Sequence, residues 1–573
     1  MVRRVRDLGQ LRCGDKNSLI IYNSSRFFVY KDLFYKKMYW AFLASTLVTS
    51  FFLAWFLIDL FYADTPDLPG TQEIANITNL GFGPDRKLLV VDFDVSTIDL
   101  SDKKWARMEV YQTIGNTVTS TFYPVGIEVK GSGVNERPKL NYAIEIWEAA
   151  DASIPCTSIA TCDDDKANLF DMFTDDFEDW VMRGGYKEPT LLRDAIPSNM
   201  EGGILEHTLV ELVFRNDGKY YYEGVYLLYP AIQRKVLEKR LNWPTKGKKT
   251  DCEDNPTDTE ILETAIIGEY TNPGLGSRKT ACNAVNDMIK FRYPKCDDAV
   301  PCYVDHMKSI FDVLTMTNTS VVDVDLNSFA INFLAESMML NGDYPIASQY
   351  FYKHPVTQTL HAGPRWDYDY LSWRFAETKG WGVEANYGST HMPLWVHLGQ
   401  NAEFINLVNN MRNITTTTNL NIAKAIINER RGQFQAGYFD RNIARWNGFG
   451  NRVVAYTKDF NLVNHRVKDT WKEEIDFIED IFEKRAAWML ANPVEPFEFK
   501  HDHFFVVRTL FTMIPFVMFF LALLVWTVVL VYYLIDVCKC DCGCDCSGEE
   551  ADEEEGIRLV DGAGASKEEP LRF

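Results

Sequence analysis

Residues 327–373 read NSFAINFLAESMMLNGDYPIASQYFYKHPVTQTLHAGPRWDYDYLSW. Apolar residues at helical spacing fill the first part, and two short aromatic segments after it predict a β-hairpin. Three acids bracket this hairpin: Asp343, Asp367 and Asp369. Divalent cations such as Mg²⁺ prefer carboxylate oxygens, and one acid can be left to orient a nucleophile. The alternative is that these acids are solvated turn residues.

Length and composition set the class of protein around this stretch. The chain has 573 residues, of which 46% are apolar and 14% aromatic, so it can bury a large core. Its formal net charge of −21 argues against a nucleic-acid partner, because phosphate binding requires a basic surface. We therefore expect a folded protein that binds no nucleic acid.

Two uncharged apolar runs, Met38–Ile58 and Thr509–Ile535, are each long enough to cross a bilayer. Nine Lys or Arg against three Asp precede the first run, so the positive-inside rule predicts that residues 1–37 are cytosolic. A second span returns the tail to the cytosol and leaves the middle of the chain in the secretory-pathway lumen or outside the cell. A cleaved signal peptide is the alternative for the first run, but no small-x-small site follows it.

Cysteine usage agrees with this topology. Six of the 12 cysteines lie between the two runs, an even number that suits three disulfides in an oxidising compartment: Cys156, Cys162, Cys252, Cys282, Cys296 and Cys302. Their pairing stays open. Sequons in the same section begin at Asn76, Asn318 and Asn413, although another begins at Asn23. Five further cysteines follow the second run and predict S-palmitoylation, with a soft-metal site as the alternative: Cys538, Cys540, Cys542, Cys544 and Cys546.

The middle section begins with predicted strands and ends with predicted helices. Alternation predicts strands at 87–95, 123–130 and 141–147, and a hairpin whose strands, 207–214 and 220–229, flank Asn-Asp-Gly at 216–218. Glu211, inside that hairpin, is expected to face solvent. Residues 243–305 are polar and predict an insertion of loops and short helices. Helical spacing predicts helices at 392–413, 419–433 and 469–490.

These observations divide the chain into six parts. They are a basic cytosolic segment (1–37), a transmembrane helix (38–62), a stalk (63–86), a main domain (87–503), a second transmembrane helix (509–535) and a Cys-rich, then acidic, cytosolic tail (536–573). The main domain includes the insertion at 243–305 and a helical part at 390–492.

Two places in the main domain are candidates for phosphate binding. Gly131 and Ser132 lie in a predicted turn that can bring backbone N–H groups to phosphate oxygens, and Lys139 can reach the same anion. An ordinary hairpin loop is the alternative. Arg193, where a predicted strand gives way to a helix, can hold a phosphate or an acidic partner, and the alternative there is a surface cation.

In this order, the segments resemble the spore-coat protein H (CotH) family of atypical protein kinases. The matching pieces are VKGS at 129–132, RPKLNY at 137–142, DW at 179–180, LLR at 191–193, GVYLL at 224–228, NGD at 341–343 and WDYD at 366–369. The similarity extends over about residues 87–373.

The resemblance implies an α+β, kinase-like two-lobed domain that uses ATP and Mg²⁺ or Mn²⁺ to phosphorylate Ser or Thr of secreted or cell-surface proteins. It assigns Lys139, with Gly131, Ser132 and Arg193, to the nucleotide phosphates. Asp343 is assigned to the attacking hydroxyl as catalytic acid/base. Asp367 and Asp369 are assigned to the metal, with Ser348 as a further oxygen ligand.

Two positions depart from the family pattern. Ser348 stands where we expect an Asn to complete metal binding, and Tyr229-Pro230 stand where the family usually has Glu. These departures favour a second hypothesis, a catalytically inactive relative that acts as a binding or scaffolding protein. A third hypothesis, a hydrolase metal site, uses four residues: His354, His361, Asp367 and Asp369.

Overall fold

The computed structural model describes residues 72–80, 86–94, 103–114, 117–130, 139–148, 163–171, 175–241, 266–270, 289–293, 310, 312–314, 323–341, 348–368, 381, 393–450, 452–456, 462–496, 524, 527, 528 and 531. The predicted segment 38–62, most of 509–535, all the cysteines and the cytosolic tail lie outside these residues. Within the described part of the chain, no helix combines the length and the apolar character that a membrane span requires.

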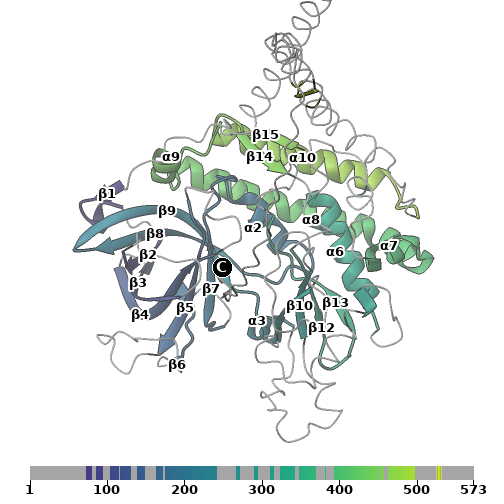
Figure 1. Cartoon of the computed structure of the whole chain (residues 1–573), viewed down its shortest axis with the longest axis horizontal. Helices are drawn as coiled ribbons and strands as arrows, with labels where there is room; N and C mark the ends of the chain where they lie inside the picture. Colours follow the sequence, from purple (N-terminus) through teal and green to yellow (C-terminus); the bar gives the residue numbers. More distant parts are fainter. Residues whose placement is uncertain are drawn as a thin grey trace, which may run out of the picture. The chain divides into compact units, whose positions relative to one another are not determined.

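A closed seven-stranded β-barrel forms the first half of the main domain (Figure 1). Its strands are β2 (Lys87–Asp92), β3 (Lys104–Ile114), β4 (Thr117–Val129), β5 (Tyr142–Glu148), β7 (Asp179–Arg183), β8 (Thr208–Asn216) and β9 (Lys219–Pro230). They follow the order β9-β7-β5-β4-β3-β2-β8, and the β8–β9 pairing closes the barrel. Two short strands extend it: β1 (Gln72–Ile74) pairs with β9, and β6 (Asp163–Asp164) pairs with β5.

The barrel confirms the strands and the hairpin that alternation predicts. Inward-facing apolar residues recur at every second position, as with Leu89 and Val91 on β2, because side chains of a strand alternate between its faces. Asn216 pairs with Lys219 across the predicted turn. All these strand pairs are antiparallel except β2–β8, which is parallel.

The prediction that Glu211 faces solvent is wrong, since its side chain is only 2% exposed. The outer face of β8 at this point is covered by a short 3-10 helix, η1 (Ile77–Leu80), from the segment predicted to be a stalk. Glu211 pairs with Arg86 at 3.4 Å and accepts a hydrogen bond from the Tyr222 hydroxyl at 3.2 Å. The barrel strand is therefore buried on both faces here.

Helices form the second half of the main domain. They are α2 (Leu192–Asn199), α3 (Arg234–Arg240), α6 (Leu326–Met339), α7 (Pro393–Gln400), α8 (Ala402–Gln435), α9 (Asp440–Trp446) and α10 (Trp471–Ala491). The long helix α8 packs against α2, α6, α7 and α10 and supplies the centre of an apolar core separate from that of the barrel. A two-stranded sheet, β14 (Arg452–Tyr456) and β15 (Leu462–Arg466), connects α9 to α10.

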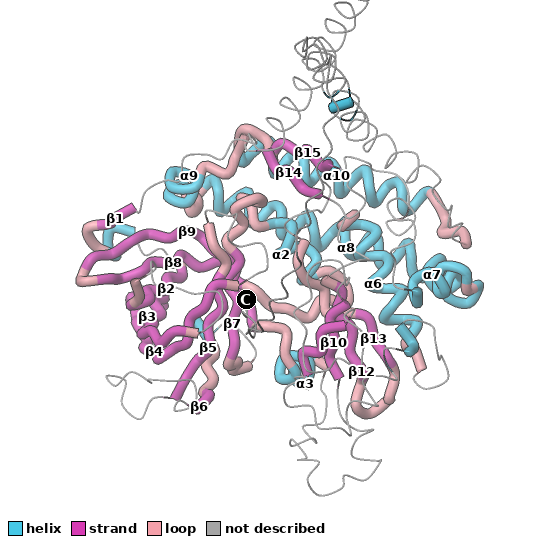
Figure 2. Tube along the Cα trace, in the orientation of Figure 1, coloured by secondary structure: helices cyan, strands magenta, loops and turns pink. Residues whose placement is uncertain are grey.

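The predicted helix boundaries near residue 400 are wrong. Figure 2 shows α8 as one helix through the polar stretch that the pattern treats as a break at 414–418. Thr415 and Thr416 are buried, so packing offsets their low helix propensity. The break comes instead at Asn401, whose side chain accepts hydrogen bonds from the N–H groups of Glu403 and Phe404.

The insertion contains strands where the sequence predicts loops and short helices. Within 243–305 the structure describes β10 (Ile266–Tyr270) and β11 (Ile289–Tyr293). They join β12 (Gln349–Lys353) and β13 (Leu360–Ala362) in an antiparallel sheet of order β11-β10-β12-β13. The predicted aromatic hairpin after α6 is therefore confirmed, as the second half of a larger sheet. The whole arrangement confirms the α+β class.

Candidate functional site

Asp367 and Ser348 come together next to the end of β7. The Ser348 Oγ donates to Asp367 Oδ2 at 3.3 Å, and the Arg183 guanidinium donates to Asp367 Oδ1. Both Asp367 (φ 68°) and Ser348 (φ 56°) have left-handed backbone conformations that non-glycine residues rarely adopt. Such local strain is found preferentially at functional sites. The structure thus joins two residues that the sequence assigns to one metal site.

Arg183, the last residue of β7, holds a second carboxylate. Its Nε donates to Asp194 Oδ2 at 3.1 Å, and Asp194 lies in the first turn of α2. Figure 1 shows β7 on the side of the barrel next to α2, so Arg183 connects the barrel to the helical part. Sequence reasoning missed both residues. The available signal was a basic residue directly before Gly184-Gly185 at the end of a buried strand.

Tyr368 fixes the segment that carries Asp367. Its N–H donates to Asp194 Oδ1 at 2.9 Å, and its hydroxyl donates to the carboxyl of Glu336 on α6. Burial raises the pKa of Glu336 to about 7, although the Tyr368 hydrogen bond and the charge of Arg365 act in the opposite direction. Asp367 is therefore attached to α2 and α6 through its neighbour in the chain.

Lys139, the predicted nucleotide lysine, is almost completely buried. Its side chain and backbone together are 2% exposed. The Nζ donates to the Val225 carbonyl at 2.6 Å and to Asn442 Oδ1 at 2.8 Å, and it lies 4.6 Å from the centre of the Tyr226 ring. Burial lowers the pKa of Lys139 to about 7, while the negative charge of Glu223 acts to raise it.

Residues of α9 enclose Lys139 and its neighbour Glu223. Arg445 pairs with the Glu223 carboxylate at 2.8 Å, and the Trp446 indole donates to the Glu223 carbonyl at 2.6 Å. Gly224, with φ +140°, permits this close approach, because a Cβ there would lie 2.7 Å from Asn442 Oδ1. The helical part therefore contributes directly to the surroundings of the lysine.

The surroundings of Lys139 and of Asp367 meet at the end of β7. The Gly184 N–H donates to Asn141 Oδ1 at 2.7 Å, and a Cβ on Gly184 would lie 3.2 Å from Lys139 Cγ. Gly184 directly follows Arg183, which contacts Asp367. One strand end thus positions both a buried lysine and an acid with an exposed edge.

Other predicted site residues are placed elsewhere or lie outside the description. Arg193 has no exposed surface; its guanidinium pairs with Glu188 at 3.3 Å and with Glu474 of α10 at 2.7 Å. This gives Arg193 a part in joining the helices. Four candidates lie outside the described residues: Gly131, Ser132, Asp343 and Asp369.

The two histidines of the hydrolase hypothesis lie together in the β12–β13 hairpin. The rings of His354 and His361 are 5.7 Å apart, and His361 Nδ1 lies 3.6 Å from a carboxylate oxygen of Asp325. Asp367 makes its contacts with Arg183 and Ser348 instead. The acid beside the histidines is therefore the residue that caps the start of α6.

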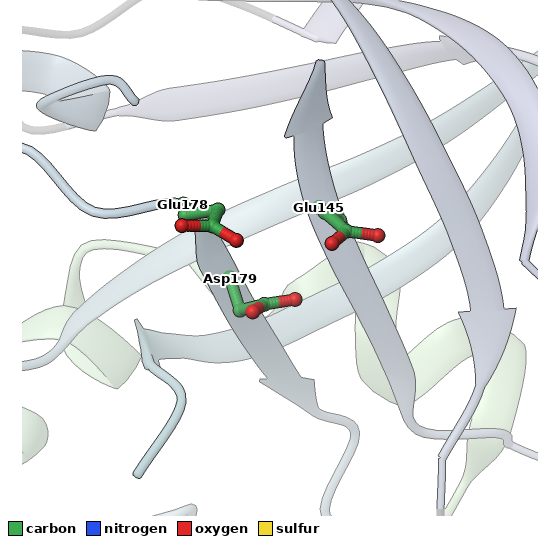
Figure 3. A group of neighbouring side chains, drawn as sticks. All are labelled: Glu145, Glu178 and Asp179. Atoms are coloured by element: carbon green, nitrogen blue, oxygen red, sulfur yellow. The ribbon is translucent and has the colours of Figure 1, made fainter. Parts of the chain in front are cut away.

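Figure 3 shows an acidic group at the opposite end of β7, formed by Glu145, Glu178 and Asp179. One oxygen of each lies within 4.8 Å of the others. Lys103 contacts Glu145 at 2.7 Å and Asp179 at 3.0 Å, and Lys235 pairs with Glu178. Burial acts to lower the pKa of Lys103, but the two acids outweigh it and the pKa is raised. Two lysines thus offset most of the charge of these three acids.

Comparison with protein families extends the sequence resemblance. A family profile described as CotH kinase protein matches residues 127–489, more than half of the chain. The match runs from the end of β4 through nearly all of α10, so it includes the helices that enclose Lys139. A search of curated proteins found no match.

Proposed function

The chain belongs to the CotH kinase family, and from this premise we propose that it transfers the γ-phosphate of ATP to Ser or Thr of secreted or cell-surface proteins. The family implies ATP and a divalent metal, Mg²⁺ or Mn²⁺. The observation that carries the proposal is the Asp367–Ser348 pair, held by Arg183 at the end of β7, where the following residue, Gly184, lies against Lys139. We further propose that these two halves act as the two lobes of a kinase-like domain.

The donor chemistry at Asp367 fits such a metal. A carboxylate and a hydroxyl supply hard oxygen ligands, which Mg²⁺ and Mn²⁺ prefer. Asp367 and Ser348 would hold the ion, with Asp369 as a further ligand, and the ion would neutralise charge on the phosphates. Asp343 would accept the proton of the attacking hydroxyl. Lys139 would act as a cation near the phosphates, with Gly131 and Ser132 supplying N–H groups.

The cellular setting proposed for this reaction rests on the sequence. The two long apolar runs and the basic N-terminal segment support a two-pass membrane protein with both termini in the cytosol. The main domain then works in the lumen or outside the cell, which is where secreted substrates are found. Its partners are protein substrates and the lipid bilayer.

Phosphate transfer by the purified full-length protein tests the proposal. We expect Asp367→Asn and Asp343→Asn each to reduce transfer at least about 100-fold, because metal and hydroxyl positioning supply most of the catalysis. Asp343→Asn should still be stabilised by Mn²⁺-ATP, by roughly 2.7 kcal/mol at 100 times the dissociation constant. Asp469→Asn, at an exposed acid that pairs with Arg466, is the control and should keep full activity. Full transfer by both site variants would disprove the assignment.

A binding or scaffolding protein without kinase activity is the second candidate. The burial of Lys139 favours it, because the residue is only 2% exposed and its amine already donates to Val225 and Asn442. The engagement of Asp367 by Arg183 favours it as well. The same assays separate the two candidates: absence of both Mn²⁺-ATP stabilisation and transfer supports the binding protein.

A further inference from the structure

The Arg183 guanidinium lies between two carboxylates that belong to different elements. Its Nε is 3.1 Å from Asp194 Oδ2, and its Nη2 contacts Asp367 Oδ1. The side chains of Arg183 and Asp194 are only 8% and 7% exposed, whereas that of Asp367 is 33% exposed. One carboxylate is therefore a buried partner of the arginine, and the other reaches solvent.

The surrounding contacts fix this arginine. Arg183 pairs with Leu227 in the β7–β9 ladder, and its guanidinium lies 5.6 Å from the centre of the Trp366 ring. Asp194 also accepts the Tyr368 N–H, so it cannot turn away without breaking a second hydrogen bond. The positive charge is thus held at the edge of Asp367 that faces the barrel.

These contacts engage both oxygens of Asp367. Oδ1 accepts from Arg183, and Oδ2 accepts from the Ser348 hydroxyl. A hydroxyl can rotate and offer a lone pair to a metal ion, but a guanidinium carries only donors and a permanent charge. A divalent cation at Asp367 is therefore repelled by Arg183 and competes with it for the same carboxylate.

We propose that Arg183 is the resident counter-cation of Asp367, and that a divalent cation binds by taking its place while the guanidinium stays on Asp194. The inference rests on the metal-binding role of Asp367 in the proposed function. Arg183 and Asp194 are positioning residues: the first sets how tightly the metal binds, and the second retains the displaced charge. The two carboxylates make the exchange possible without leaving a buried arginine unpaired, which would be costly.

Mn²⁺ binding to the full-length protein without nucleotide, followed by the EPR signal of free Mn²⁺, tests this exchange. Arg183→Gln should lower the Mn²⁺ concentration for half-saturation about tenfold, because a repelling charge is removed. Asp194→Asn should raise this concentration several-fold. Of the two acids beside the guanidinium, Asp367 is then the one that still carries a charge, so Arg183 competes more strongly with the metal for it. Opposite shifts exclude general damage to the local structure, which would weaken binding in both variants.

Arg365→Gln is the matched control for Arg183→Gln. Arg365 is also a buried arginine in this region, but it donates to the main-chain carbonyls of Pro197, Met200 and Glu201. Its replacement should lower the melting temperature without tightening Mn²⁺ binding. The double variant Arg183→Gln/Asp367→Asn should lose the affinity gained in Arg183→Gln, which places that gain at Asp367.

A metal-free measurement keeps the test independent of activity. In EDTA, the losses in melting temperature caused by Arg183→Gln and Asp367→Asn should not add in the double variant, because both remove the same ion pair. Additive losses, or Mn²⁺ binding by Arg183→Gln that is no tighter than wild type, would overturn the inference. If instead Asp367→Asn keeps both Mn²⁺ binding and phosphate transfer, the proposed function fails at this site.

Discussion

Arg183 and Arg193 lie on either side of the turn between β7 and α2, but the acids that they contact differ in exposure. Arg183 reaches an acid that is partly exposed, whereas Arg193 is enclosed by Glu188 and Glu474, and burial raises the pKa of Glu188 to about 7. The resemblance points to Arg193 because it ends a matching segment. It could not show that Glu474, 281 residues further along the chain, is its partner. A residue's role here follows from its partners, and those partners are distant in sequence.

Replacing Arg193 should affect folding more than nucleotide binding. Arg193→Met leaves two buried carboxylates without their cation, so we expect the free energy of unfolding to fall by about 3–5 kcal/mol. Urea unfolding of the purified protein measures this. Arg466→Ala, which removes an exposed pair with Asp469, is the control and should change stability by less than about 0.5 kcal/mol. Unchanged unfolding with loss of ATP binding would make Arg193 a phosphate ligand after all.

Strands were predictable because alternation is a local property. The predicted β2, β5 and the β8–β9 hairpin match the structure within a few residues. Helix ends were less predictable, because packing overrides propensity: Thr415 and Thr416 remain helical since they are buried against neighbouring helices. Strands β10 and β11 were missed because each is short and finds its partners in a sheet completed by the distant β12.

The cap of α8 provides a test at the scale of one element. Asn401 accepts hydrogen bonds from two otherwise unsatisfied N–H groups, those of Glu403 at 2.8 Å and Phe404 at 3.1 Å. Asn401→Ala should therefore destabilise the protein by about 1 kcal/mol, measured by urea unfolding. Asn421→Ala, at an exposed position inside the same helix, should be neutral or stabilise by roughly 0.5 kcal/mol. Equal effects at the two positions would mean that the Asn401 side chain does not stabilise the start of α8.

At the scale of the molecule, closure of the barrel and assembly of the site both depend on contacts that pattern analysis cannot specify. The parallel β2–β8 pairing joins strands separated by five others in the chain, and no local signal encodes it. The resemblance did select Asp367, Ser348 and Lys139. It did not predict that α9 encloses the lysine or that Arg183 bridges two acids, since these contacts arise only when the barrel and helices pack together.

Glu336 makes the stability of the whole molecule depend on pH. Burial raises its pKa from 4.5 to about 7. Between these values the folded protein holds a proton that the unfolded chain releases, so the contribution of Glu336 to stability is complete below pH 4.5 and is lost as the pH rises to about 7. Glu336→Gln keeps an acceptor for the Tyr368 hydroxyl but cannot ionise. Relative to wild type, the free energy of unfolding of Glu336→Gln should increase by on the order of 2–3 kcal/mol as the pH rises across this window, and by nothing further above it.

Urea unfolding in EDTA, repeated from pH 4.5 to pH 8, measures this difference without a contribution from metal binding. Tyr368→Phe is the matched control, because its hydroxyl acts to lower the pKa of Glu336. Loss of the Tyr368 hydroxyl should shift the decline in the free energy of unfolding to higher pH. Glu336→Gln should make that decline smaller. Other groups change protonation in this range in all three proteins, so the differences between their curves carry the result. Parallel curves for wild type and Glu336→Gln would show that burial does not hold the proton on this carboxyl. In that case the Glu336–Tyr368 hydrogen bond joins a charged acid to the segment that carries Asp367.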